Sequence, residues 1–500
     1  MPDLAMVCAL ATVVCLFVCF GGATALFSDT DAGWHMRNGQ WILAHRTLPL
    51  NDNFSFSKPG APWIAWEWGS DVLMGSVERV CGLGGVACLF GLAIGAAVWM
   101  WFRLNWAAGG SFPLAAVFAV PMISTSSIHW LARPHVFGWL FLMATVWWCE
   151  RACEKAKAKL TAAEACGIAL ASAVWANLHG SFLLGPAIFL IYAVGAGLAF
   201  ALWGIRRSIA PYLQGALAAA LGSLCNPYGW RLHQRVFTYL TDSALLRRVG
   251  EFQSFDFHSA GAGWVLAALC IGLLGGAAAL SVRRPERFLL AVALTTAALI
   301  SARSLPLAAL ALLPLANGSL TEALSLASGL RPQLRRRLDR ALIYSDRLLG
   351  FDRKLHGFAL VPLAAVLLFL GIRGHAAFPS DQIPVAAAER IAALPASARI
   401  FSTDKFGGYL IYRFPARQVF FDGRSDFYGV NFIDRYAWMF EARPGWRKEF
   451  ERGAFSQVLL PPDAPLVAAL EADGWDRLYS DRTAVLLAPR GDRLMARETN

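Results

Sequence analysis

The 500-residue chain has few charged residues: Asp, Glu, Lys and Arg make up 16% of it, whereas apolar residues make up 57%. So small a charged fraction excludes an ordinary soluble enzyme. Common metal-binding and nucleotide-binding motifs are also lacking. There is no HExxH metal motif, and the glycines near position 407 match neither a phosphate-binding Walker loop nor a dinucleotide-binding fingerprint.

Cysteine is absent from the chain after position 270. The ten cysteines lie at positions 8, 15, 19, 81, 88, 149, 153, 166, 225 and 270. All are in or beside apolar runs, and none belongs to a metal-type CxxC pair. We therefore expect small apolar packing residues, and a C-terminal part without disulfides.

Apolar runs of about 16–20 residues are abundant, and this is the length that a membrane-spanning helix needs. They predict a mainly α-helical polytopic membrane bundle of about eleven spans. The predicted spans cover residues 4–27, 84–102, 112–128, 136–149, 162–177, 182–203, 210–225, 262–281, 287–301, 304–318 and 357–373. Ala23-Thr24-Ala25 could end a signal peptide, but the opening Met-Pro-Asp lacks positive charge, so we expect a retained first helix.

The distribution of Lys and Arg predicts the orientation of the chain. With the N-terminus inside, the inside loops hold more Lys and Arg than the outside loops, as the positive-inside rule requires. The net charge of +11 then reflects topology and not nucleic-acid binding. Eight of the nine histidines fall outside in this topology. We therefore interpret the outer face as the working face.

Two outside segments differ from the spans. Within the first outside loop, 28–83, acidic residues alternate with Trp and Leu over residues 63–80, which predicts a helix lying in the membrane interface. The tail, 374–500, follows a membrane domain of residues 1–373 and is predicted to be a small extracytoplasmic α/β domain. Its expected strands are 398–402, 418–421, 456–460, 476–480 and 484–488, the last two forming a hairpin around Asp481-Arg482, with helices near 386–394, 406–413, 430–441 and 465–473.

Asp29 and Asp31 stand at the mouth of the first apolar segment. A carboxylate there could be a general base, with a pKa raised by desolvation, or a ligand of a hard cation. The alternative is a helix terminus with solvated carboxylates. His35 and Arg37 follow closely, and Arg37 could bind a phosphate or act as an interfacial anchor.

Arg133 and Arg303 each lie in a very short outside loop between two spans. Such a charge needs a partner, either a phosphate or one of Asp29, Asp31 and Glu251. Further polar candidates in the outside loops are His135, His179 and Glu251. In the tail, Asp422-Gly423-Arg424 is a turn or, with Asp426, a binding group.

Several strings resemble bacterial membrane glycosyltransferases of the GT-C type: DTDAGWHMRNGQWILAHRTLPLNDNFSFSKPGAPWIAWEWGSDVL, NLHGSF, NPYG, EFQSFDFHS, ARSLPL and GGYLIYRFPARQVFFDGRSDFYG. The resemblance implies inverting transfer of a sugar from a polyprenyl-phosphate carrier, with Asp29 and Asp31 as the catalytic acidic pair. Oligosaccharyltransferase-like members hold a divalent metal with a second acidic motif in the next outside loop. Here that loop, 129–135, contains no carboxylate, so we expect neither a metal nor another cofactor.

The resulting hypothesis is a glycosyltransferase on the outer face of a bacterial inner membrane, with a cytoplasmic N-terminus and a periplasmic tail. Its partners would be the lipid bilayer, a polyprenyl-phosphate sugar donor and a glycan, lipid or protein acceptor, but no nucleic acid. The predicted catalytic residues are Asp29 and Asp31, and the predicted substrate-binding residues are His35, Arg37, Arg133, His135, His179, Glu251 and Arg303. The alternatives are a transporter or flippase of a lipid-linked or anionic envelope substrate, and an inactive envelope scaffold.

Overall fold

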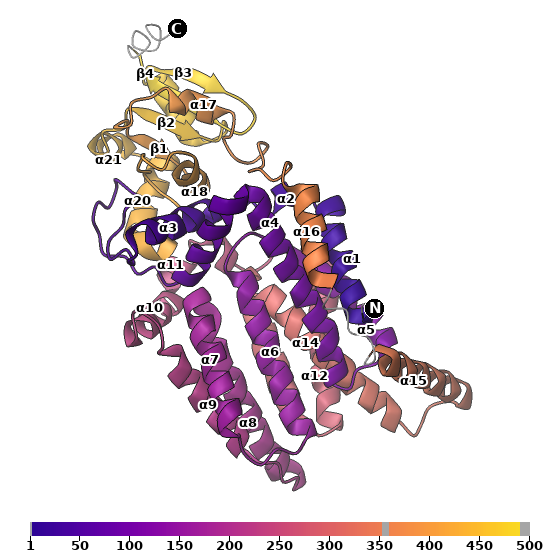
Figure 1. The fold of residues 1–500 in the computed structure, drawn as a ribbon. Coiled ribbons are helices and arrows are strands. Elements are labelled where there is room, and N and C mark those ends of the chain that lie inside the picture. Colours follow the sequence, from indigo (N-terminus) through magenta and orange to yellow (C-terminus); the bar gives the residue numbers. More distant parts are fainter. Residues whose placement is uncertain (1–2, 353–359, 491–500) are drawn as a thin grey trace.

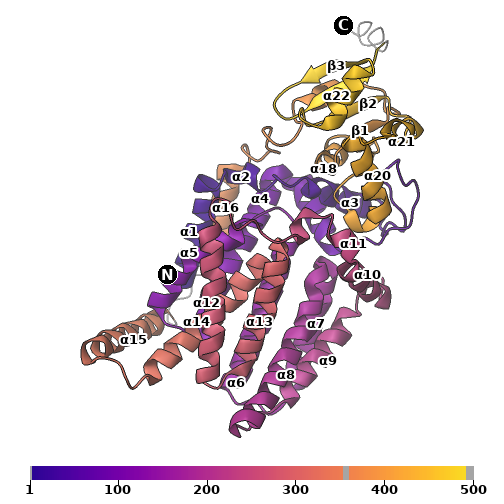
Figure 2. The ribbon, with the colours of Figure 1, turned by 180° about the vertical axis from the view of Figure 1, so that it is seen from behind.

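A computed structural model describes residues 3–352 and 360–490. It is mainly helical, with a small sheet near the C-terminus (Figure 1). Long helices form a bundle, and the sheet lies beyond one end of that bundle in both ribbon views (Figure 2). The start of the last predicted span, His356 and the final residues of the predicted tail domain lie outside the described residues.

All eleven predicted spans coincide with helices. These are α1 (Leu4–Cys19) with α2 (Gly22–Ala25), α4 (Trp68–Ala107), α5 (Phe112–Ser127), α6 (His135–Glu154), α7 (Ala162–Leu178), η1 (Gly180–Leu183) with α8 (Leu184–Trp203), α9 (Ala210–Ser223), α12 (Ala262–Ser281), α13 (Pro285–Ile300), η3 (Ala302–Ser304) with α14 (Leu305–Leu326), and α16 (Leu360–Ile372). The first span is interrupted because Gly21 and Gly22 have positive φ angles, which a helix does not allow.

By length and composition, four helical segments of the described chain can cross a membrane: Trp68–Ala107, Gly180–Trp203, Ala262–Ser281 and Ala302–Leu326. Shorter apolar helices are Leu4–Cys19, Phe112–Ser127, Ala162–Leu178 and Val361–Ile372. These helices indicate a multi-pass membrane protein. The count of eleven spans stays a prediction.

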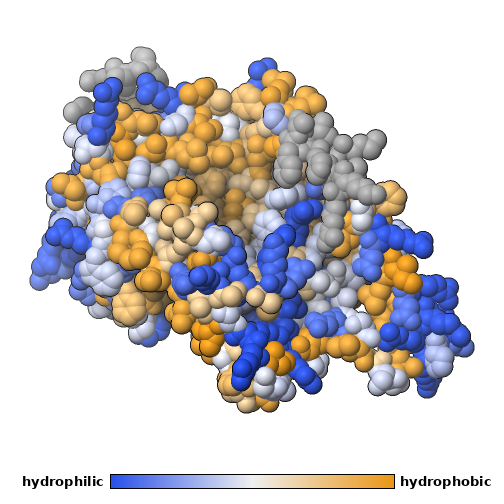
Figure 3. All heavy atoms as spheres, turned by 60° about the horizontal axis from the view of Figure 1, so that its bottom comes forward, coloured by the Kyte–Doolittle hydropathy of each residue, from blue (hydrophilic) through white to orange (hydrophobic). Residues whose placement is uncertain are grey.

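The outer faces of the bundle helices are apolar. On α9, Leu213, Leu217 and Leu221 are all at least half exposed, and their spacing of four residues places them on one helix face. Seen from the end opposite the sheet, apolar areas alternate with clusters of hydrophilic residues (Figure 3). The exposed apolar part of this surface is costly in water and stable against lipid.

The first part of α4 is the segment that was predicted as an interfacial helix. At Gly82 the backbone leaves the helical region, with φ 63° and ψ −166°, so the helix axis breaks between this part and the predicted span. This part of α4 packs on α3 (Asp31–His45), a helix that the sequence pattern did not predict. The contact is close, because a Cβ at Gly75 would lie 2.7 Å from the Met36 carbonyl oxygen.

Three short elements lie between α9 and α12, and one long helix lies between α14 and α16: α10 (Trp230–Thr241), α11 (Ser243–Leu246), η2 (Gly250–Phe252) and α15 (Pro332–Asp352). α10 lies near the end of the bundle that faces the tail (Figure 2). α10 and η2 contribute side chains to the site described below.

The tail contains a four-stranded sheet in the order β1-β2-β4-β3, built from β1 (Ile400–Ser402), β2 (Gln457–Leu460), β3 (Trp475–Ser480) and β4 (Val485–Pro489). β1 and β2 are parallel and the other pairs antiparallel, so the hairpin around Asp481-Arg482 is confirmed. The tail helices are α17 (Ala387–Ala392), α18 (Asp404–Arg413), α19 (Ser425–Tyr428), α20 (Val430–Phe440), α21 (Trp446–Arg452) and α22 (Pro465–Ala472).

The predicted strand at 418–421 is wrong. Val419 makes only an isolated parallel bridge to Ser55, in the predicted first outside loop, 28–83. Its neighbours Phe420 and Phe421 are buried in an aromatic cluster that also contains Trp34 and Trp63. The tail and this loop therefore share one hydrophobic core, which holds the tail over the end of the bundle.

Candidate functional site

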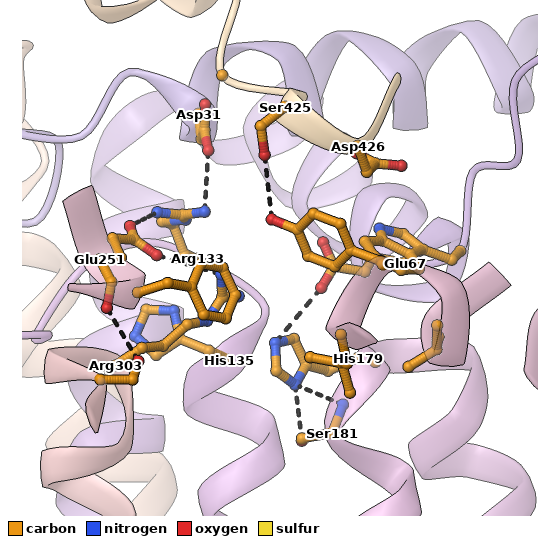
Figure 4. Close-up of a pocket in the computed structure, with 18 of the residues that line it drawn as sticks. Asp31, Glu67, Arg133, His135, His179, Ser181, Glu251, Arg303, Ser425 and Asp426 are labelled. Atoms are coloured by element: carbon orange, nitrogen blue, oxygen red, sulfur yellow. Dashed lines mark hydrogen bonds and ion pairs between the residues drawn. The ribbon is translucent and has the colours of Figure 1, made fainter. Parts of the chain in front are cut away.

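A cavity of about 310 Å³ lies where the end of the bundle meets the first outside loop and the tail. Its wall draws side chains from segments far apart in the sequence (Figure 4). They include Asp31, Trp34, Trp63, Trp66, Glu67, His135, Arg133, His179, Tyr239, Glu251, Arg303, Gly423, Ser425 and Asp426. A concave site of mixed apolar and ionisable lining is the usual form of a small-molecule site.

Arg133 is the centre of the charged side of this cavity. Its Nη1 lies 2.5 Å from Asp29 Oδ2 and also pairs with Glu251, while its Nη2 lies 2.9 Å from Asp31 Oδ2. Arg303 Nη1 lies 3.2 Å from the other oxygen of Glu251. Three carboxylates thus share two guanidinium groups, and the cluster carries an excess negative charge when all are ionised.

The acidic pair is positioned by the start of α3. Asp31 is the first residue of this helix, and its backbone N–H donates to Asp29 Oδ1 at 2.9 Å. Burial, and then the charge of Asp29, raise the pKa of Asp31 to about 8, although Arg133 opposes the shift. Asp31 is therefore a stronger base than an ordinary carboxylate once its proton has left.

Glu251 holds the two arginines together. Burial alone would raise the pKa of Glu251, but Arg133 and Arg303 bring it below the usual range, so Glu251 stays ionised. Among the described residues, Arg303 pairs with one carboxylate, whereas Arg133 pairs with three. Arg303 consequently keeps more of its donors for a bound anion.

The opposite side of the cavity carries Glu67, His179 and Ser181. The backbone N–H of Ser181 donates to His179 Nδ1 at 3.2 Å, so the ring hydrogen is on Nε2. This Nε2 faces Glu67 Oε1 at 3.4 Å. Burial and the nearby Arg303 lower the pKa of His179 well below its usual value, so this imidazole is neutral.

Two predicted substrate-binding residues lie outside the cavity wall. His35 is buried behind it, with Nδ1 2.5 Å from Asp71 Oδ1, and its ring stacks on Trp34. Arg37 donates from Nε and Nη2 to the carbonyl oxygen of Tyr412, at 2.8 and 2.5 Å, and thereby binds α18. In this structure both residues support the walls of the site.

A second cavity, of about 350 Å³, adjoins the first. The residues common to both are Asp31, Arg133, Tyr239, Glu251, Arg303, Gly423 and Ser425. The second cavity adds Asp29, Asp404 and Lys405 to its lining. The Asp31–Arg133–Glu251 cluster is thus reached from two hollows, which allows two substrates to meet at it.

The tail loop 422–426 forms part of the wall, a role that the sequence left open between a turn and a binding group. Arg424 is buried and donates to Asp422 at 2.7 and 2.8 Å and to Asp52 at 2.8 Å. This fixes Gly423 against Asp31, so closely that a Cβ at Gly423 would collide with the Asp31 carboxylate. The tail thereby completes the site.

Glu67, Trp34 and Trp66 were not predicted as site residues. For Glu67 and Trp66 the available signal was an acidic residue between tryptophans in an amphipathic stretch, and this pattern is equally typical of an interfacial helix. Trp34 joins the wall through the core that segment 28–83 shares with the tail, and Trp66 packs against the core of the bundle.

The charged cluster does not fit a divalent metal ion as it stands. Among the described residues, no group of three or more His, Cys, Asp or Glu side chains is arranged to hold a metal. Asp29, Asp31 and Glu251 do converge, but on the Arg133 guanidinium, which occupies the position a shared cation would need.

The fold is similar to that of an archaeal oligosaccharyltransferase. With the Archaeoglobus fulgidus oligosaccharyltransferase tethered to an acceptor peptide containing the NVT sequon, the TM-score is 0.53 at 14% identity, covering 91% of this chain and 68% of that chain. With its apo form the TM-score is 0.51 at 14% identity, covering 91% and 69%. No family model and no curated protein sequence matches the chain. At 14% identity the similarity shows that this chain shares the fold of that protein.

Proposed function

We propose that the protein is a membrane glycosyltransferase that moves a sugar from a polyprenyl-phosphate carrier to an acceptor. One observation carries this proposal: Asp29 and Asp31 are held beside Arg133 and Arg303 where two adjoining cavities meet at the end of an apolar bundle. The oligosaccharyltransferase-like fold supports the same reaction class.

The donor enters the first cavity. Leu184, Leu240 and Leu307 line its apolar part and suit the start of a lipid chain. Arg303 faces the same cavity and binds the carrier phosphate, because a guanidinium matches two phosphate oxygens. His135 and His179 line the donor cavity, while Glu251 keeps Arg303 in place.

The acceptor enters the second, more polar cavity and presents a hydroxyl to Asp31. The carboxylate takes the hydroxyl proton as the oxygen attacks the anomeric carbon, and the carbon–oxygen bond to the phosphate breaks. The phosphate leaves with the bonding electron pair, and Arg303 stabilises its charge. A single displacement of this kind inverts the anomeric carbon.

Transfer by this mechanism requires no divalent metal. Arg133 supplies the positive charge between Asp29, Asp31 and Glu251, and so keeps the acidic pair in place. The reaction takes place on the outer face of a bacterial inner membrane, with the N-terminus in the cytoplasm and the tail outside.

The test begins with mass spectrometry of lipids that copurify with the protein, followed by a transfer assay with the carrier found. The protein should form a glycosylated product, and the double variant D29N/D31N should form none. Full product formation by the double variant would overturn the proposed base. Movement of the carrier across liposomes without any product would instead support a flippase.

A further inference from the structure

The cavity has two chemically different sides. Figure 4 shows Asp31, Arg133, Glu251 and Arg303 on one side and Glu67, His179 and Ser181 on the other. The first side has an arginine that suits a phosphate and a carboxylate that can act as a base. The proposed mechanism leaves the Glu67 side without a ligand.

The Glu67 carboxyl group lacks a short hydrogen bond. Its closest polar contacts among the described residues are His179 Nε2 at 3.4 Å and His35 Nε2 at 3.8 Å, both longer than ordinary hydrogen bonds. The side chain is only 12% exposed. A buried carboxyl with unfilled acceptor positions is costly, and hydroxyl donors of a ligand would remove that cost.

The same wall holds an unpartnered donor. Trp34 is 5% exposed, and its indole Nε1 has no hydrogen-bond partner within the described chain. Trp34 and Glu67 both contact His35, so the free donor and the free acceptor belong to one part of the wall. The Trp34 Nε1 atom is itself buried, whereas Glu67 keeps exposed surface, so a ligand hydroxyl can donate to the Glu67 carboxyl.

Aromatic rings complete this part of the cavity. Trp66 and Tyr239 meet edge to face, with ring centroids 5.4 Å apart, and both line the cavity. Their apolar surfaces suit the C–H face of a sugar ring. An anion would be repelled by Glu67, whereas the apolar rings and the Glu67 acceptor together suit a neutral polyhydroxylated ring.

We propose that Trp34, Trp66, Glu67 and His179 form the subsite that holds the glycosyl group of the donor while Arg303 holds its phosphate. The inference rests on the proposed function and adds the part of the donor that this wall recognises. Glu67 and His179 bind hydroxyl groups, and Trp66 packs against the ring.

The experiment compares binding of undecaprenyl phosphate with binding of undecaprenyl phosphate carrying neutral hexoses or N-acetylhexosamines, all in nanodiscs. The wild-type protein should bind at least one glycosylated carrier about tenfold more tightly than the bare carrier. E67Q and H179Q should each lose most of this preference while binding the bare carrier as before. R303Q should weaken binding of the bare carrier and of the glycosylated carriers by the same factor.

D434N is the control, because Asp434 is an exposed acidic residue of the tail that pairs with Arg248 and does not line the cavity. It should keep the wild-type preference. If E67Q and H179Q keep it too, or if the wild-type protein binds all carriers equally, the sugar subsite is wrong. If the wild-type protein binds no carrier at all, the proposed function itself fails. Thermal unfolding of each variant checks that the fold is retained, and W34F replaces any variant that does not fold.

Discussion

Arg133 Nη2 lies 2.9 Å from Asp31 Oδ2, joining the loop before α6 to the first residue of α3. The same guanidinium also holds Asp29 and Glu251, so one side chain organises three carboxylates from two distant segments of the chain. If Arg133 were absent, these acids would repel one another in a largely buried site. The geometry of the proposed base therefore depends on this single cation.

Replacing Arg133 with Gln should lower both transfer activity and stability. Activity should fall at least about 100-fold, because the acidic pair loses its position and its counter-charge. Breaking this largely buried network should destabilise the fold by about 3 kcal/mol. Transfer assays and chemical denaturation measure the two effects. R248Q is the control, since it removes an exposed arginine paired with Asp434 and should change neither quantity much.

Activity should depend on pH through Asp31. Because its pKa is raised to about 8, the basic carboxylate form is populated only as the pH rises through that value. The kcat/KM should therefore fall about tenfold for each pH unit below the midpoint. Removing the Asp29 charge with D29N should shift the midpoint toward lower pH, since that charge contributes to the raised pKa. An unchanged midpoint in D29N would contradict this assignment.

Chelation of divalent metals should leave transfer unaffected. Arg133 already lies between the carboxylates that would otherwise share a cation. Activity in excess EDTA should remain within about twofold of the untreated enzyme, because no metal–ligand bond has to form. Loss of activity in EDTA that added Mn²⁺ or Mg²⁺ restores would show that a metal takes part.

Gly423→Ala should disable the site without unfolding the chain. Its Cβ would collide with the Asp31 carboxylate, so Asp31 or the tail loop must move. We expect activity to fall at least about tenfold while the thermal unfolding temperature changes little. G263A is the control, because a Cβ at Gly263 meets no atom within 4 Å. Equal activities of the two variants would argue against a contribution of the tail loop.

Much of the architecture follows from local sequence patterns. The apolar runs coincide with helices because a span must satisfy its backbone hydrogen bonds internally and expose apolar side chains to lipid. The hairpin at Asp481-Arg482 follows from alternation and a turn signal. Asp29, Asp31, Arg133, Glu251 and Arg303 were all predicted on one face of the membrane, and in the structure they lie around adjoining cavities.

The remaining features depend on contacts between distant segments. The packing of α3 on α4 placed His35 behind the wall, and its packing on α18 placed Arg37 there. Glu67, directly before α4, lies in the wall. Val419 bridges Ser55 outside the sheet because loop and tail share one aromatic core. That shared core also brings Gly423 against Asp31. By itself the sequence determined the long apolar helices and the polar groups in the loops between them, since those follow from local periodicity and charge. Only the tertiary structure decided which of them meet, because that depends on side-chain packing between residues hundreds of positions apart.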